Sequence, residues 1–199
     1  MEMLAYTFFV VPFIVLVYVA VLLFLRPPRA VMQATLLGGL AMAVLNALGD
    51  LLAYYVHWWH YAIDGLVFHL PLPFYITPLL IYGGLGYLLI WRFWRGRWHW
   101  LALLLLIGLP LFGIARDFYG AALAHSTYLT WDSVLAGPFD VVLWLLMFYA
   151  GFLLFKLTST HNWPPAEANK RRGAPVPPRA GASPAPTRYD GSVRQTRTE

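Results

Sequence analysis

The sequence lacks cysteine and has few charged side chains. The absence of cysteine excludes disulfide bonds, thiolate metal sites and thiol nucleophiles. Only 12% of the 199 residues are charged and 60% are hydrophobic, whereas soluble domains are about 25% charged. Such a chain cannot cover a water-exposed surface with polar groups. The composition therefore predicts a multi-pass membrane protein with a single membrane domain.

Lysine is also scarce, because arginine outnumbers it 12 to 2. This ratio is typical of a prokaryotic protein, so the expected location is the inner (plasma) membrane. The formal net charge of +5 does not indicate nucleic-acid binding, because the sequence contains no helix-turn-helix, zinc finger or aromatic stacking platform. We expect the lipid bilayer, and no nucleic acid, as the partner of this chain.

Five apolar segments are long enough to cross a bilayer, which takes about 20 residues. They cover residues 3–25, 30–56, 74–91, 98–115 and 134–157. The first is interpreted as a retained helix, because its start has no basic residue and its apolar run is longer than that of a signal peptide. The predicted fold is an all-α bundle of five transmembrane helices over residues 1–158.

The composition changes after residue 158. Residues 159–199 contain seven Pro and seven Lys or Arg, and few apolar side chains. Such a segment cannot bury enough apolar surface to offset the entropy of ordering the chain. We therefore predict a disordered, basic, Pro-rich tail.

The basic residues predict the orientation of the bundle. Five spans place the two chain ends on opposite sides of the membrane. All Lys and Arg residues except Arg116 fall on one side, in the loops after the first and third spans and at the C-terminal side. The positive-inside rule makes that side cytoplasmic. We expect the N-terminus outside and the C-terminus, with its tail, in the cytoplasm.

The segment NALGDLLAYYVHWWHYAID, residues 46–64, carries most of the ionisable side chains of the first half of the chain. Wound as a helix at about 100° per residue, it places five polar residues on one stripe roughly 80° wide. These five are Asn46, Asp50, His57, His60 and Asp64. The same face of the second span carries the small residues Thr35, Gly39 and Ala43 at four-residue spacing, which favours close helix packing in lipid. We expect this face to contact a neighbouring helix or a second copy of the chain.

Two later ionisable residues, Arg116 directly after the fourth span and Asp140 in the fifth, are expected at the same outer level. Ionisable groups at this depth are costly unless they are paired or face water. For Arg116 we expect an acidic partner across the bundle, Asp50 or Asp140. The adjacent Asp117 is a weaker candidate, because neighbouring residues on a helix do not face each other. The predicted binding residues are Asn46, Asp50, His57, His60, Asp64, Arg116 and Asp140.

Several functions fit this predicted cluster. It can be structural, with hydrogen bonds and ion pairs that lock the outer end of the bundle. It can form the pocket of an enzyme that modifies a lipid or isoprenoid in the outer leaflet, with Asp50 and His57 as acid–base pair and Arg116 binding an anionic headgroup. It can bind a metal through His57, His60 and Asp64, whose ligand types suit zinc or iron. A proton or ion pathway is disfavoured, because the inner halves of the other spans offer almost no polar side chains.

One segment has a family resemblance. WWHYAIDGLVFHLPLPFYITPLLIYGG, residues 58–84, resembles the W-x-Y and L-P-L segment of small carotenoid-cyclase-like membrane proteins. That family follows its Pro-Leu with paired glutamates expected to perform acid chemistry. Here Pro73 and Phe74 stand in their place. The resemblance covers fewer than 30 residues and implies an isoprenoid as the lipid of the enzyme hypothesis.

Overall fold

The protein is described by a computed structural model, which covers residues 2–94, 97–123 and 129–159. The predicted tail, residues 159–199, lies outside the described residues except for Ser159. Within the described residues, five helical segments are long and apolar enough to cross a membrane. They cover Met3–Leu25, Arg29–Tyr55, Leu72–Trp94, His99–Ala121 and Ala136–Thr158. The prediction of five helices long and apolar enough to span a membrane is therefore confirmed, with ends that shift by between zero and six residues.

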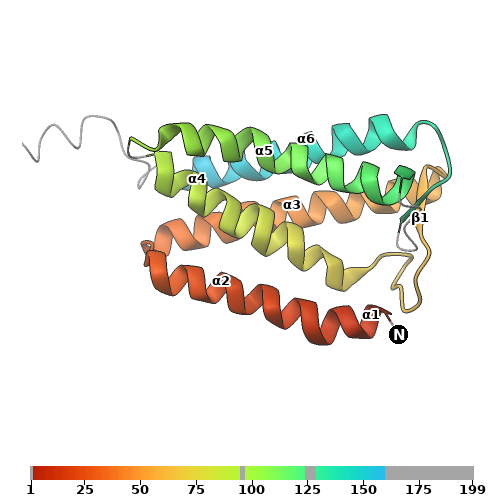
Figure 1. Ribbon diagram of the computed structural model, residues 1–199, viewed down its shortest axis with the longest axis horizontal. Coiled ribbons are helices and arrows are strands. Elements are labelled where there is room, and N and C mark those ends of the chain that lie inside the picture. The colour runs from red at the N-terminus through yellow and green to blue at the C-terminus, as the bar shows by residue number, and fades with distance from the viewer. Residues whose placement is uncertain (1, 95–96, 124–128, 160–199) are drawn as a thin grey trace, which may run out of the picture. The chain divides into compact units, whose positions relative to one another are not determined.

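The spans are composed of shorter α, 3₁₀ and π segments. In chain order these are α1 (Glu2–Ala5), η1 (Tyr6–Val10), α2 (Val11–Leu25), α3 (Arg29–Tyr55), η2 (Leu72–Tyr75), η3 (Thr77–Leu85), α4 (Gly86–Trp94), α5 (His99–Phe118), η4 (Tyr119–Leu123) and α6 (Ala136–Thr158). The strands β1 (Trp59–Tyr61) and β2 (Leu129–Trp131) lie in the connections. Figure 1 shows the long helices lying side by side, with the N-terminus and β1 at the same end of the bundle.

The surface of the bundle carries large apolar side chains. Phe8, Phe9 and Phe24 of the first span are more than two-thirds exposed, and Ile107 and Phe112 of α5 are more than half exposed. Water would penalise this exposure, whereas lipid tails do not. The surface thus supports the same conclusion as helix length, a multi-pass membrane protein.

Helix α3 lies at the centre of the bundle, where it packs against both α6 and η3. Close approach is possible because Gly39 faces Gly83 and Gly84 of the third span. Thr35, Gly39 and Ala43 are all buried within this chain. The predicted packing face therefore contacts helices of the same chain, and association with a second copy through it stays a prediction.

Replacing Gly39 by alanine is expected to destabilise the protein. A Cβ atom at position 39 would collide with the carbonyl oxygen of Leu79, which is backbone and cannot rotate away. Overpacking of this kind costs about 1–3 kcal/mol. Gly108→Ala is a matched control, because a Cβ there meets nothing within 4 Å. In detergent, Gly39→Ala should unfold at a lower temperature than the native chain, and Gly108→Ala should not. Equal melting temperatures for the two variants would contradict the close α3–η3 contact.

In the core of the bundle, Tyr87 joins α4 to α6. Its ring is fully buried and stacks on Phe155, with ring centroids 5.8 Å apart. Its hydroxyl group donates a 2.7 Å hydrogen bond to the carbonyl oxygen of Phe148. The buried hydroxyl therefore has a partner, as a polar group in an apolar core requires.

The predicted second span, residues 30–56, agrees with α3, which ends at Tyr55, but the helical wheel that placed residues 46–64 on one stripe is wrong beyond that residue. His57 adopts a left-handed conformation with φ 56°. Its N–H bonds the carbonyl oxygen of Tyr54, and the N–H of Trp58 bonds that of Ala53. These two bonds form a Schellman motif, which satisfies the last carbonyl groups and ends a helix. Helical periodicity therefore does not apply to His57, His60 and Asp64.

After this turn the chain runs as a strand. β1 pairs with β2 in antiparallel register, with Trp59 opposite Trp131 and Tyr61 opposite Leu129. Successive side chains of a strand point to opposite faces. Trp59 and Tyr61 consequently share one face, and His60 points to the other.

Candidate functional site

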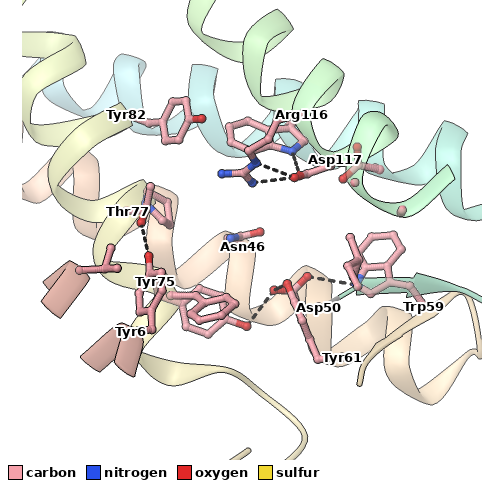
Figure 2. A pocket seen from close by; sticks show the side chains of 18 of the residues that line it. Tyr6, Asn46, Asp50, Trp59, Tyr61, Tyr75, Thr77, Tyr82, Arg116 and Asp117 are labelled. Carbon is pink, nitrogen blue, oxygen red and sulfur yellow. Dashed lines mark hydrogen bonds and ion pairs between the residues drawn. The ribbon is translucent and has the colours of Figure 1, made fainter. Parts of the chain in front are cut away.

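A cavity of about 680 Å³ lies at the end of the bundle where α3 ends and α6 begins. We call it the pocket. Residues from all five spans line it, together with Trp59 and Tyr61 of β1 and Leu129 of β2. Its size falls within the range of small-molecule binding sites. Figure 2 shows that polar and aromatic side chains from different helices converge on this space.

Asp50 is the centre of the first polar group in the pocket. Its carboxyl group is 4% exposed and accepts three hydrogen bonds. The Tyr75 hydroxyl donates over 2.8 Å, the Tyr61 hydroxyl over 3.0 Å and the Trp59 indole N–H over 3.2 Å (Figure 2). A buried carboxylate is tolerated only when its oxygens are hydrogen-bonded. Asp50 thus joins α3 to β1 and to the start of the third span.

The alternation of β1 explains why two of these donors reach Asp50. Trp59 and Tyr61 lie on the strand face that covers the pocket, and both line it. Burial and the nearby Asp50 raise the pKa of the Tyr61 hydroxyl well above its usual range. Tyr61 therefore keeps its proton and remains a hydrogen-bond donor. His60, on the opposite face, pairs with Asp132 at 2.7 Å and is partly exposed.

Arg116 and Asp117 form the second polar group. The Nε of Arg116 donates to Oδ1 of Asp117 at 2.8 Å, and one terminal guanidinium nitrogen lies 2.7 Å from the same oxygen. Trp144 of α6 donates its indole N–H to the other oxygen of Asp117 at 2.7 Å. The expectation that Arg116 pairs with Asp50 or Asp140 is therefore wrong. The long arginine side chain bends back to its neighbour, and Trp144 holds the carboxylate in place.

Asp140 is the third acidic residue of the pocket. It lies in the second turn of α6, its side chain lines the pocket, and it is only 6% exposed. Its Oδ2 atom is buried and has no hydrogen-bond partner among the described residues. No ion pair joins it to any described residue either. Asp140 differs in this respect from Asp50 and Asp117, whose oxygens are occupied by donors.

The structure brings together four of the seven predicted binding residues. Asn46, Asp50, Arg116 and Asp140 line the pocket. In the view of Figure 2, Asn46 lies between Asp50 and the Arg116–Asp117 pair. The other three, His57, His60 and Asp64, do not line it, because they follow the helix end described above.

The proposed metal ligands do not converge. In the part of the chain that the structure describes, no group of three His, Cys, Asp or Glu side chains could hold a metal ion. His57 and Asp64 are exposed, and His60 is engaged by Asp132. The acid–base pair of Asp50 with His57 also fails, since His57 lies beyond the Schellman turn and Asp50 is surrounded by Trp59, Tyr61 and Tyr75.

Replacement of His57 by glycine is expected to stabilise the protein. A left-handed backbone costs a side-chain-bearing residue about 1 kcal/mol or more, and glycine avoids this cost. His57→Gly should therefore raise the melting temperature, and His57→Val, whose branched side chain fits this conformation poorly, should lower it. Ligand binding by His57→Gly should match that of the native chain. If His57→Gly folds normally but loses ligand binding, His57 belongs to the binding site after all.

Sequence reasoning missed most of the residues that complete the pocket. Trp59 and Tyr61 are not among the predicted binding residues, and Asp117 is only the weaker candidate partner of Arg116 there, because the two are neighbours in sequence. Tyr75 and Trp144 carry no sequence signal that links them to Asp50 or Asp117, since 25 and 27 residues separate the partners. Only the alternation of a short strand would have predicted that Trp59 and Tyr61 share a face.

The walls of the pocket include unusual helix geometry. The structure describes three π-helical segments, η1, η3 and η4. Each contributes residues to the pocket, for example Tyr6, Thr77 and Gly120. The Tyr6 and Thr77 hydroxyl groups are joined by a 2.8 Å hydrogen bond between the first and third spans (Figure 2). π-Helical segments are rare and occur frequently at functional sites.

Comparison of this chain with protein-family models, curated proteins and solved structures finds no match. No family match therefore accompanies the resemblance of residues 58–84 to carotenoid-cyclase-like proteins. The pocket is the feature of this chain that indicates a function.

Proposed function

We propose that this protein binds an amphipathic small molecule, taken from the bilayer, in the pocket between its five spans. The observation that carries the proposal is Asp140. A buried carboxyl group without a hydrogen-bond partner is costly in an apolar environment. A purely structural cluster would pair every such group, as the protein does for Asp50 and Asp117. The Oδ2 atom of Asp140 is an unused hydrogen-bond acceptor at the pocket wall, and this supports a ligand that provides its partner.

The walls of the pocket match an amphipathic ligand. Phe9, Val10 and Phe74 provide apolar surface, whereas Asn46, Asp50 and Asp140 provide polar groups. A few polar groups in a mostly apolar cavity are typical of sites that orient a small molecule.

The first span supports entry from the lipid. Phe9 lines the pocket and is also 76% exposed on the surface of the bundle. The wall formed by η1 is therefore thin and borders the apolar outer surface. A lipid-soluble molecule can reach the pocket from this side without crossing water.

Charge supports an orientation in which the pocket faces outward. In the described residues, the end opposite the pocket carries Arg26, Arg29, Arg92, Arg97 and Lys156. By the positive-inside rule, we propose that this end lies in the cytoplasm and that the N-terminus lies outside the plasma membrane.

This orientation can be tested with tags at the two ends of the chain. A fluorescent protein fused to the C-terminus should fold and fluoresce, and a tag at the N-terminus should react with impermeant reagents. A tag that reacts only after the membrane is permeabilised would reverse the orientation.

Ligand binding can be tested on the purified chain. The protein is extracted in a mild detergent, and the molecules that co-purify are measured by native mass spectrometry. Ala121→Phe fills part of the pocket, because Ala121 lines it. Ala20→Phe is the matched control, because Ala20 is exposed on α2 and does not line the pocket. We expect one class of amphipathic molecule on the native chain and on Ala20→Phe, and little of it on Ala121→Phe.

Two results would contradict the proposal. One is a set of co-purified lipids that is the same in all three proteins. The other is a native chain that carries no bound molecule and is stabilised by none of the amphiphiles added to it. Size-exclusion chromatography of each variant separates loss of binding from loss of folding.

Proton transfer to the bound molecule is a second candidate function, and Asp140 favours it. A buried carboxyl group at the wall of a mostly apolar pocket, with no hydrogen-bond partner at its Oδ2 atom among the described residues, suits general acid–base catalysis on a lipid or isoprenoid. Membranes that contain the protein would be incubated in D₂O, and the co-purified molecule examined for deuterium bound to carbon. Incorporation with the native chain, but not with Asp140→Asn, supports an enzyme. No incorporation above background with either protein supports binding alone, and equal incorporation above background in both would contradict a role of Asp140 in the proton transfer.

A further inference from the structure

The charges around the pocket define the chemistry of its ligand further. In the described part of the chain, four charged residues line the pocket, and three of them are acidic: Asp50, Asp117 and Asp140. The single basic residue, Arg116, is already paired with Asp117. The described lining of the pocket therefore has no unpaired positive charge for an anionic headgroup.

The three acidic residues are not equivalent. Asp117 is neutralised by Arg116, with Nε–Oδ1 2.8 Å apart. Asp50 is surrounded by three neutral donors, which stabilise a negative charge but do not cancel it. Among the described residues, Asp140 has no hydrogen-bond donor at its Oδ2 atom and no ion pair. The charges of Asp50 and Asp140 therefore call for a positive group from the ligand. That group either carries hydrogen-bond donors or fits among the acidic side chains without them.

Aromatic side chains favour the same kind of ligand. Tyr6, Tyr61, Tyr75 and Trp144 are among those that line the pocket. The faces of aromatic rings attract cations, and the attraction grows when water is excluded. The Arg116 guanidinium carbon lies 5.5 Å from the centre of the Trp144 ring, which shows that this pocket already accommodates a cation against an aromatic ring.

We propose that the polar end of the ligand is a cation, an amine or quaternary ammonium group, held between Asp140 and Asp50 and the surrounding aromatic rings. This inference rests on the proposed function, because it names the class of amphipathic molecule that the pocket takes. An anionic headgroup, which the sequence suggested for Arg116, would face Asp50 and Asp140, neither of which forms an ion pair with a described residue.

The test compares three probes with the same twelve-carbon chain. They are dodecyltrimethylammonium, the neutral 1,2-dodecanediol and dodecyl phosphate. Binding to the full chain in a neutral maltoside detergent is measured by equilibrium dialysis, with empty micelles as the background. We expect saturable binding of the ammonium probe, weaker binding of the diol and the weakest binding of the phosphate.

Asp140 variants link the preference to the proposed contact. Asp140→Asn should weaken binding of the ammonium probe about tenfold or more, because it removes one partner of a buried charge pair. The same variant should leave binding of the diol nearly unchanged. Asp140→Glu retains the charge and should retain the preference for the cation, which also controls for folding at this position.

Each other outcome overturns the inference. Equal binding of the diol and the ammonium probe would show that Asp140 does not select a cation, while the pocket itself would still bind an amphipathic molecule. Tighter binding of the phosphate would assign the ligand to Arg116. Absence of saturable binding for all three probes would contradict both this inference and the proposed function.

Discussion

Asp50→Leu is expected to cause the largest loss of stability of any single substitution in the pocket. The change removes one acceptor and leaves three donors without a partner: the buried Tyr75 hydroxyl and Trp59 indole N–H and the half-buried Tyr61 hydroxyl. An unsatisfied buried polar group costs about 1–3 kcal/mol. Three of them together approach the whole stability of many folded domains, which is about 5–15 kcal/mol. The protein should unfold at a much lower temperature or fail to accumulate in the membrane.

A compensating variant distinguishes hydrogen bonding from packing. Replacing both partners of a buried hydrogen bond by apolar groups of similar shape can be nearly neutral. Asp50→Leu combined with Tyr61→Phe and Tyr75→Phe should therefore be more stable than Asp50→Leu alone. Melting temperatures of the single, double and combined variants form a thermodynamic cycle. If the combined variant is the least stable of the set, the hydrogen bonds to Asp50 are not what holds β1 and η2 against α3.

Asp50→Asn should fall between the native chain and Asp50→Leu. The asparagine amide retains one oxygen acceptor but points two donors at groups that are themselves donors. Tyr61 and Tyr75 can each rotate the hydroxyl to accept a hydrogen bond, whereas the Trp59 indole N–H can only donate. The loss of stability that remains in Asp50→Asn should therefore become smaller when Trp59→Phe is added.

The sequence was sufficient to predict the spans because they depend on local composition. A run of 23 residues without charge, such as Met3–Leu25, has few alternatives to a membrane-spanning helix. The placement of Asp50, Arg116 and Asp140 at one end of the bundle followed from the same count of spans. Residue type and chain order were therefore sufficient to predict most of the fold.

The details of the pocket could not be predicted from the sequence where the local backbone geometry departs from a regular helix. The polar stripe assumed that residues 46–64 form one helix, and a left-handed residue at His57 ended it after Tyr55. The strand that follows sends His60 away from Asp50 and brings Tyr61 to it. A β-strand alternates every two residues and a helix every 3.6, so a wrong element reverses which side chains face inward.

Partner choice was the second limit. The Arg116–Asp117 pair was discounted on helix geometry, but Trp144 from α6 fixes the Asp117 carboxylate where Arg116 can reach it. Such a three-residue arrangement depends on the packing of α5 against α6. No spacing in one segment of the sequence encodes it.

Asp140→Leu is expected to have the opposite effect on stability from Asp50→Leu. In the described structure the Oδ2 atom of Asp140 is buried without a partner, so leucine removes a desolvated polar group and orphans no donor. Replacing such a group by an apolar side chain of similar size should stabilise the ligand-free protein by about 1–3 kcal/mol. The melting temperature of ligand-free protein, after exhaustive washing in detergent, should rise.

The same substitution should abolish the stabilisation that a bound ligand provides. A ligand that binds only the folded protein raises its stability with concentration, so the native chain should gain from the ammonium probe and Asp140→Leu should not. Residues that are kept at a cost to stability are typical of functional sites. If Asp140→Leu instead destabilises the ligand-free chain as Asp50→Leu does, Asp140 belongs to the structural network. The pocket would then lose the observation on which its proposed function depends.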